Sequence, residues 1–358
     1  MKDTRNGAYY APLQVTKQVL GELTLCYCVA PLQYQGKRHF LVASEKQHPC
    51  LLFDEAGNYA DKVWDGPGGT MTIVQAPGAD GAFLATHRFY SPNDNKQASI
   101  VLCRHADGAW KVQTLLELPG VHRFDILERN GVHYLIACTI KSDYEYKDDW
   151  RFPGKVYAAV LPEDLTALSE DYRLEAAVIC PALTRNHGYS RDGQTGIVTA
   201  DEGVFRFTPP EAPGGDWGVE QLLTEPTSDA LLLDLDGDGE KELLTLSPFH
   251  GDTLRVCKPA AAHTAGPQYE PIFAYGTRIP FAHAICGAEW NSKQIAVIGH
   301  RKEARDLLAV YHDGKDYRVA LLDHDVGPAN ALSYQLEGKT RILSANRETN
   351  EIALYTLV

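Results

Sequence analysis

The feature that most constrains the fold is a recurring unit: an alternating strand, a tight polar turn, a second apolar strand and one or two further strands. Units of this kind start at seven places along the chain, near Thr24, Met71, His122, His187, Asp229, His283 and Ala329. Repeats of about 40–50 residues with four strands each are typical of β-propellers. We therefore predict an all-β fold, a seven-bladed β-propeller.

The whole chain, residues 1–358, is predicted to be a single propeller domain. No long stretch keeps helical periodicity, and the 30 glycines and 20 prolines supply turns. The longest interval between units contains a charged and aromatic insertion, Lys141–Gly154, which we expect to be a functional surface loop. The last unit has three strands, and we expect the run Ala8–Val15 to complete it and close the ring.

Charge and hydropathy exclude several classes of function. The net charge is −13 and no run of Lys and Arg interrupts it, which argues against a nucleic-acid partner. No window is apolar enough for a membrane span. The polar start of the chain lacks the apolar core of a signal peptide, and the eight cysteines lie mostly in apolar runs, so we expect a cytoplasmic protein with reduced thiols.

The repeat also predicts where functional side chains meet. In a propeller blade, the start of the innermost strand and the end of the second strand lie on the same face. Histidines or cations recur at these positions, which predicts a substrate-binding site at one mouth of the central channel. The residues are His87, His122, Lys141, His187, His250, His283, His300, Arg301 and Arg347.

An acidic motif over residues 234–242 predicts a metal site in the fifth unit. Alternating carboxylates, with glycines that permit a tight turn, provide the oxygen ligands that Ca²⁺ prefers. The predicted ligands are Asp234, Asp236, Asp238, Glu240 and Glu242. We expect a structural Ca²⁺ ion on the face opposite the histidines; the alternative is an acidic hairpin turn without an ion.

Four short stretches resemble the seven-bladed propeller polysaccharide lyases, which include ulvan lyases and rhamnosyl-glucuronate lyases. They are Val121–Asp125, Cys138–Ser142, Asn186–Tyr189 and Gly203–Arg206. The resemblance implies β-elimination on an acidic, uronic-acid-containing carbohydrate. It also implies that His122 and Tyr189 form the acid–base pair and that Arg206 neutralises the substrate carboxylate. Lys141 stands approximately where these families have a second histidine.

Two other functions fit the same residues. Propellers often serve as interaction platforms, so the chain is alternatively a non-catalytic carbohydrate- or protein-binding propeller. Histidines that converge on one concavity also suit a metal-dependent hydrolase, in which they are ligands of an ion such as Zn²⁺.

Overall fold

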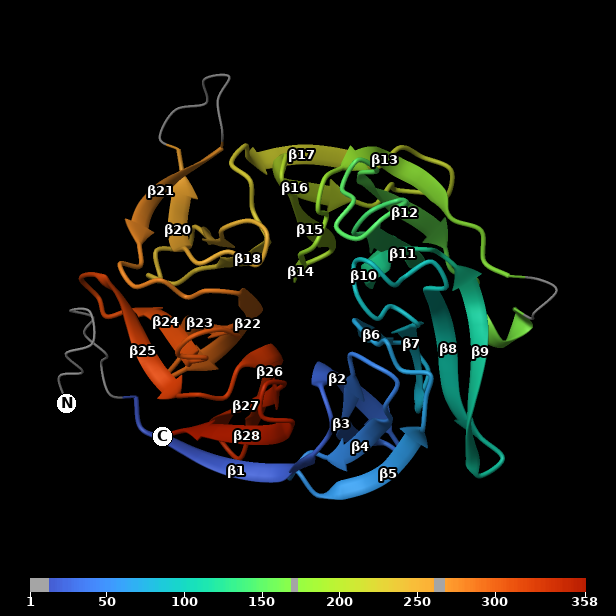
Figure 1. Cartoon of the computed structure of the whole chain (residues 1–358), viewed down its shortest axis with the longest axis horizontal. Coiled ribbons are helices and arrows are strands. Elements are labelled where there is room, and N and C mark those ends of the chain that lie inside the picture. Colours follow the sequence, from blue (N-terminus) through green and yellow to red (C-terminus); the bar gives the residue numbers. More distant parts are fainter. Residues whose placement is uncertain (1–12, 169–172, 261–267) are drawn as a thin grey trace.

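A computed structural model describes residues 13–168, 173–260 and 268–358. These residues form seven four-stranded antiparallel sheets arranged as blades around a central axis (Figure 1). The prediction of an all-β, seven-bladed propeller is confirmed. No helix among the described residues is long and apolar enough to cross a membrane.

The blades are numbered here in chain order, and each lists its strands from the axis outward. Blade 1 has β2 (Cys26–Tyr34), β3 (Lys37–Ser44), β4 (Cys50–Asp54) and β5 (Tyr59–Trp64); blade 2 has β6 (Ile73–Gln75), β7 (Ala82–His87), β8 (Ser99–Ala106) and β9 (Ala109–Glu117). Blade 3 has β10 (Val121–Arg129), β11 (Val132–Thr139), β12 (Gly154–Val160) and β13 (Ala177–Leu183); blade 4 has β14 (Tyr189–Asp192), β15 (Thr195–Ala200), β16 (Gly203–Thr208) and β17 (Gly218–Leu223). Blade 5 has β18 (Asp229–Leu233), β19 (Glu242–Leu246), β20 (Leu254–Pro259) and β21 (Tyr269–Ala274); blade 6 has β22 (Ala282–Trp290), β23 (Lys293–His300), β24 (Leu307–His312) and β25 (Tyr317–Asp323). Blade 7 has β26 (Pro328–Leu336), β27 (Lys339–Asn346), β28 (Glu351–Leu357) and, outermost, β1 (Val15–Glu22). A short 3₁₀ helix (Leu165–Ala167) lies between β12 and β13.

The ring is closed by an N-terminal strand, but by a later segment than the sequence predicted. β1 covers Val15–Glu22 and pairs antiparallel with β28, from Val15 opposite Leu357 to Glu22 opposite Glu351. The predicted run Ala8–Val15 shares a single residue with β1, and its first five residues lie outside the described part of the chain. Neither run alternates regularly between apolar and polar residues, so the sequence pattern alone did not distinguish them.

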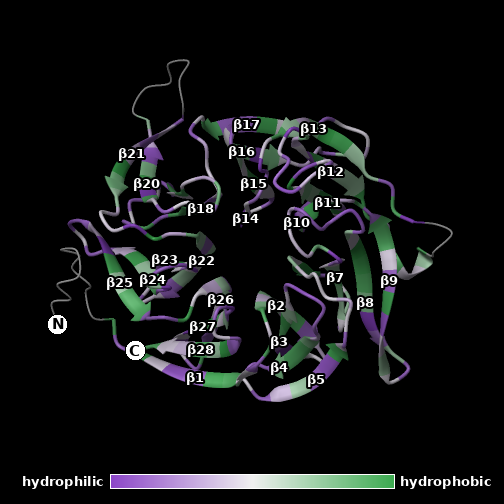
Figure 2. Cartoon of the chain, viewed as in Figure 1, coloured by the Kyte–Doolittle hydropathy of each residue, from purple (hydrophilic) through white to green (hydrophobic). Residues whose placement is uncertain are grey.

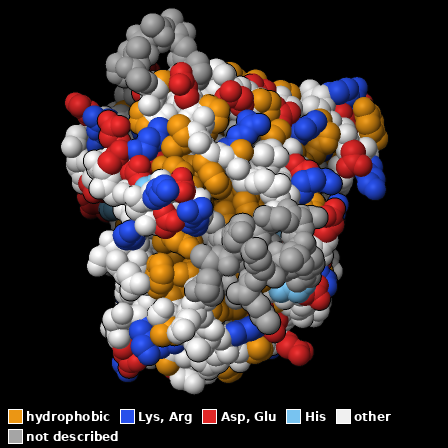
Figure 3. All heavy atoms as spheres, turned by 90° about the vertical axis from the view of Figure 1, so that its left-hand side faces the viewer, with side chains coloured by type: hydrophobic (Ala, Val, Ile, Leu, Met, Phe, Trp, Pro, Cys, Tyr) orange, Lys and Arg blue, Asp and Glu red, His pale blue; other side chains and the backbone are white. Residues whose placement is uncertain are grey.

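Burial follows the distance of a strand from the axis. Second strands are sandwiched between neighbouring blades, so six consecutive residues of β23 are buried, whereas the outermost strand β21 is mostly exposed. Hydrophobic residues concentrate along the strands and hydrophilic residues along many connecting loops (Figure 2). On the side of the ring seen in Figure 3, acidic and basic side chains are interspersed.

Irregular pairing marks the starts of several innermost strands. The register shifts between Cys26 and Cys28 in β2, between Val121 and Arg123 in β10, and between Ala282 and Ala284 in β22. A bulge leaves the extra residue outside the regular ladder, so its backbone carbonyl needs another donor. The extra residues here are Tyr27, His122 and His283.

Candidate functional site

Four imidazoles meet at the axis, and they come from two innermost strands and two loops. His122 and His283 are the bulge residues of β10 and β22, His187 lies two residues before β14, and His250 lies in the loop between β19 and β20. The ring centroid of His187 is 4.7 Å from that of His122, 4.6 Å from that of His250 and 5.2 Å from that of His283. We call these four residues the axial cluster.

The axial side chains also join each blade to the next. His122 donates from Nδ1 to the backbone carbonyl of His187 at 3.1 Å, and His283 donates from Nδ1 to the carbonyl of Ala329 at 2.6 Å. Thr72 donates in the same direction to the carbonyl of His122. These bonds satisfy carbonyls at blade starts and explain why hydrogen-bonding residues occupy this position.

A carboxylate orients His187 in the same way. Its Nδ1 lies 3.1 Å from Oδ2 of Asp229, at the start of β18, and Ser228 donates to that same oxygen at 2.9 Å. The carboxylate accepts, so the imidazole donates from Nδ1 and its Nε2 carries the lone pair.

The Nε2 atoms of His187 and His283 therefore act as hydrogen-bond acceptors within the cluster. Nε2 of His187 and Nε2 of His250 are 3.0 Å apart, and Nε2 of His283 accepts from the hydroxyl of Tyr27 at 2.9 Å. One ring nitrogen from each of His187, His250 and His283 lies within 4.8 Å of the other two. No residue that the structure describes donates to Nε2 of His122.

Burial keeps His122, His250 and His283 uncharged. It holds the pKa of His122, His250 and His283 well below the ordinary imidazole value, and neighbouring imidazoles and Arg123 lower these pKa values further. At neutral pH these rings are therefore neutral and able to accept a proton or to bind a metal ion.

The backbone around the cluster is strained. His250 has φ of 51° and Phe281 has φ of 61°, and their rings stack with centroids 4.2 Å apart. A left-handed backbone is unfavourable for bulky side chains, by roughly 1–3 kcal/mol per residue. Such strain is concentrated at functional sites in folded proteins.

An arc of aromatic rings extends from the cluster across the face of the ring. The centroids of Trp150 and Phe249 are 5.2 Å apart, those of Phe249 and His250 are 4.1 Å apart, and Phe281 follows. Trp150 belongs to the insertion Lys141–Gly154. All four rings are partly exposed, so the arc (Trp150, Phe249, His250 and Phe281) offers apolar faces beside the polar cluster.

Cations lie at both ends of this arc. At one end Lys141 and Arg185 lie 4.0 Å and 5.8 Å from the ring centroid of Trp150. At the other end Arg301 and Lys302 lie 4.7 Å and 5.0 Å from that of Phe281. Lys141 is buried and donates to the carbonyl of Asp149 at 2.7 Å, whereas Lys302 is exposed and makes no ion pair with any described residue.

Two of the predicted histidines lie away from the axis. His87 ends β7, is buried and packs edge-on against Trp64 with centroids 4.7 Å apart. His300 ends β23, donates to the carbonyl of Lys302 and accepts from the backbone of Asp306. The second strand of a blade is one strand farther from the axis, so its last side chain packs between blades.

Arg301 and Arg347 belong to a chain of ion pairs at the same ends of the strands. Glu348 lies 2.8 Å from Arg301 and 2.9 Å from Arg347, and Arg347 also pairs with Glu45. This chain links blades 6, 7 and 1. Arg347 is therefore balanced by carboxylates, and among the described residues its guanidinium makes no hydrogen bond with an axial imidazole.

Tyr189 and Arg206 do not face the axial cluster either. The hydroxyl of Tyr189 donates to Asp125 at 3.1 Å, and Arg191 pairs with the same carboxylate. Burial raises the pKa of Tyr189 well above its ordinary value, and the negative charge of Asp125 adds to the rise. Arg206 is on β16, the third strand from the axis, and pairs with Glu220 at 2.8 Å.

The acidic motif forms the turn between β18 and β19, at the end of β18 away from Asp229. Carboxylate oxygens of Asp234, Asp236 and Glu242 lie within 4.8 Å of one another. The ammonium of Lys258 on β20 lies 2.7 Å from Asp236 and 3.3 Å from Glu242, and it also pairs with Asp238. The protein thus places its own cation among the predicted calcium ligands.

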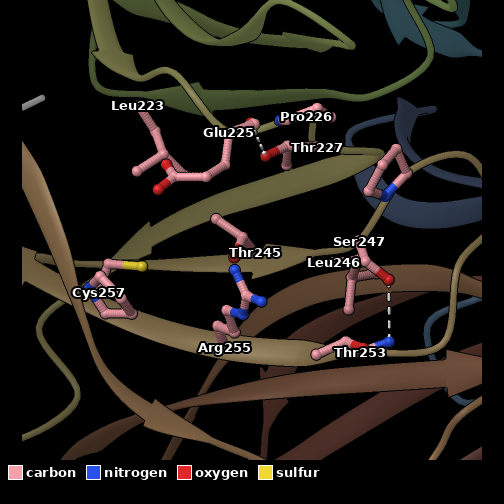
Figure 4. A pocket seen from close by; sticks show the side chains of 12 residues that line it. Leu223, Glu225, Pro226, Thr227, Thr245, Leu246, Ser247, Thr253, Arg255 and Cys257 are labelled. Carbon is pink, nitrogen blue, oxygen red and sulfur yellow. Dashed lines mark hydrogen bonds between the residues drawn. The ribbon is translucent and has the colours of Figure 1, made fainter.

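A separate pocket of about 240 Å³ opens between blades 4 and 5 (Figure 4). It is lined by residues that include Glu225, Thr245, Arg255 and Cys257. Burial and the nearby carboxylate of Glu225 raise the pKa of Cys257 to about 11, so its thiol is protonated at neutral pH and unsuited to nucleophilic chemistry.

Known proteins resemble this chain in architecture. No protein-family model and no curated protein matches the chain. Among solved structures, the β-propeller domain of Cps50 (Swd1) from Myceliophteria thermophila superposes with a TM-score of 0.60 at 10% identity, covering 96% of this chain and 100% of that one. A putative 6-phosphogluconolactonase from Bacteroides uniformis superposes with a TM-score of 0.55 at 12% identity, covering 93% and 92%. The likeness is one of fold.

Several residues of the site were not predicted from the sequence. Tyr27 could have been found, because it occupies the same position in blade 1 as His122 in blade 3 and His283 in blade 6. Phe249 and Phe281 are near neighbours of axial histidines in the sequence, which was a usable signal. Trp150 carried no such signal beyond its place in the insertion.

Proposed function

We propose that the chain is a lyase that cleaves an acidic carbohydrate by β-elimination at the axial face. The observation that carries this proposal is the aromatic arc with cations at both ends, directly beside neutral imidazoles. Apolar faces of sugar rings pack against aromatic rings, and a uronate carboxylate pairs with Lys or Arg. The arc would therefore bind the sugar, with Lys302 at the Phe281 end toward its carboxylate.

The elimination needs a neutral base and charge neutralisation. The base takes the proton from the carbon next to the carboxylate, the electron pair forms a carbon–carbon double bond, and the bond to the leaving sugar oxygen breaks. That oxygen takes a proton from water. Cations that face the carboxylate stabilise the negative charge that develops on it, typically by a few kcal/mol.

His122 is the base that we assign. Its Nδ1 is fixed by the carbonyl of His187, its Nε2 receives no hydrogen bond from the described residues, and burial lowers its pKa. A neutral imidazole with a free lone pair can accept a proton, and the cations beside the arc would have to compensate for the weaker basicity that the lowered pKa brings. The roles that the resemblance implied for Tyr189 and Arg206 are not part of this proposal, because both side chains are engaged elsewhere.

The test is to incubate the purified protein with a panel of glucuronate-containing glycans and to record the ultraviolet absorbance of an unsaturated product. We expect product with the wild type, none with His122→Gln, and undiminished product with Arg206→Gln as the matched control. Absence of product across the whole panel would count against a lyase. Loss of activity in both Tyr189→Phe and Arg206→Gln, with intact folding, would return the catalytic roles to those residues.

A metal-dependent hydrolase is the second candidate, and the 3.0 Å approach of Nε2 of His187 to Nε2 of His250 favours it. A hydrolase would release a saturated product without a change in ultraviolet absorbance. Reducing-end assays on the same incubations therefore separate the two enzymes, and glycan binding without any product would indicate a binding propeller.

A further inference from the structure

The axial cluster contains more hydrogen-bond acceptors than donors. Carbonyl or carboxylate oxygens fix the Nδ1 protons of His122, His187 and His283, so each of these rings turns a lone pair at Nε2 inward. The hydroxyl of Tyr27 supplies a donor to His283, and His250 can supply one to His187. Converging lone pairs in a buried site are stabilised by a cation.

The spacing of these nitrogens matches that of ligands on one metal ion. Two imidazoles on a tetrahedral zinc ion, with Zn–N of 2.0–2.1 Å, have nitrogens about 3.3 Å apart. Nε2 of His187 and Nε2 of His250 are 3.0 Å apart, and a nitrogen of His283 lies within 4.8 Å of both. Side-chain rotations that also release Nε2 of His283 from the hydroxyl of Tyr27 would bring the three nitrogens to ligand distances.

The outer contacts are those that metal-binding histidines usually have. Such a histidine donates its other ring N–H to a carboxylate or a backbone carbonyl, which fixes the tautomer and the orientation of the ring. Asp229 does this for His187, and the carbonyl of Ala329 does it for His283. His250 is held by its strained backbone and by the rings of Phe249 and Phe281 on either side.

We propose that His187, His250 and His283 bind a single late first-row transition-metal ion, with zinc as the expected occupant. Neutral imidazole ligands suit zinc and its neighbours, and three protein ligands leave a coordination position for water or substrate. The site would lie next to His122 and would hold a positive charge beside the aromatic arc. The inference does not depend on lyase activity.

The experiment uses the full chain and zinc alone. Protein freed of metal with a chelator is titrated with Zn²⁺ by calorimetry, and bound metal is counted by elemental analysis. We expect one equivalent in the wild type, no tight equivalent in His250→Ala, and wild-type binding in His312→Ala, whose ring packs against Tyr317 on β25. Asp229→Asn should weaken zinc affinity about 10–100-fold.

His250→Ala is the decisive variant because His250 makes none of the Nδ1 bonds that join the blades, so its removal should leave the ring folded. Co²⁺ substitution adds a second readout, since visible bands report coordination by nitrogen in a tetrahedral field. Failure of the wild type to bind one equivalent, or equal binding in His250→Ala, would overturn the site. A lyase that binds no zinc, or zinc binding without lyase activity, keeps the two proposals separate.

Discussion

The axial cluster and the acidic turn of blade 5 both gather metal-type ligands, but they differ in how their charge is balanced. In the acidic turn, Lys258 pairs with Asp236, Asp238 and Glu242. In the axial cluster, no Lys or Arg side chain that the structure describes forms a hydrogen bond or ion pair with the ring nitrogens of His187, His250 and His283. A sequence motif that resembles a set of metal ligands therefore does not establish a metal site until it is known whether a protein side chain or a metal ion balances the ligands.

The largest expected effect is that of acid on the free energy of unfolding, which should fall because of buried histidines. Burial and the charge of Arg88 lower the pKa of His87 to about 4, and burial lowers those of His122, His250 and His283. The unfolded chain takes up these protons below pH of about 6.5 and the folded chain does not, so stability falls as pH falls through that value. His87 alone accounts for about 3 kcal/mol by pH of about 4.

Denaturant unfolding of metal-free protein between pH 7.5 and 4.5 measures this loss, and His87→Gln should flatten the curve. Lys258 behaves in the opposite sense: burial opposes its charge, but the surrounding carboxylates raise its pKa, so its pairs persist well above neutral pH. Equal stability at both ends of this pH range would contradict the lowered pKa values of His122, His250 and His283.

Zinc should stabilise the protein more than calcium does. A ligand that binds the folded state adds about 2.7 kcal/mol when present at 100 times its Kd. Zinc is expected to give this gain at the axial cluster, while calcium at the acidic turn must first displace Lys258. Melting curves with Zn²⁺, Ca²⁺ or chelator test the contrast, and a larger shift with calcium than with zinc would reverse it.

Removal of Lys258 should make the acidic turn bind Ca²⁺ more tightly. Lys258→Gln is expected to cost about 1 kcal/mol without metal, because partly exposed ion pairs contribute little individually. The freed carboxylates should then bind Ca²⁺ more tightly than in the wild type, as calorimetry would show. If calcium affinity stays the same, Lys258 does not occupy the cation position and the structural calcium prediction stands unmodified.

The repeat predicted the inner strands closely because the hydrogen-bonding residue at each blade start belongs to the pattern itself. β18 begins at the predicted Asp229, and β10 and β22 begin one residue before His122 and His283. The ends of second strands were less predictable, since the path of the following loop decides where a side chain goes. The loop after β19 returns His250 to the axis, whereas His300 stays between strands.

The contact that joins Trp150 to the aromatic arc could not be predicted, for the same reason. Trp150 and Phe249 are almost a hundred residues apart, and their contact depends on two loop conformations that no periodicity specifies. The closing strand was misplaced because its pairing with β28, which the sequence pattern does not reveal, selects Val15–Glu22.

The pairing of β1 with β28 has a consequence for biosynthesis. β1 precedes all other strands and pairs with the one that follows them, so it must wait for more than three hundred residues to be translated. At about 5–20 residues per second, that wait lasts tens of seconds. During this time β1 is an unpaired strand of the nascent chain. We therefore expect ribosome-associated chaperones to influence the yield of correctly closed propellers.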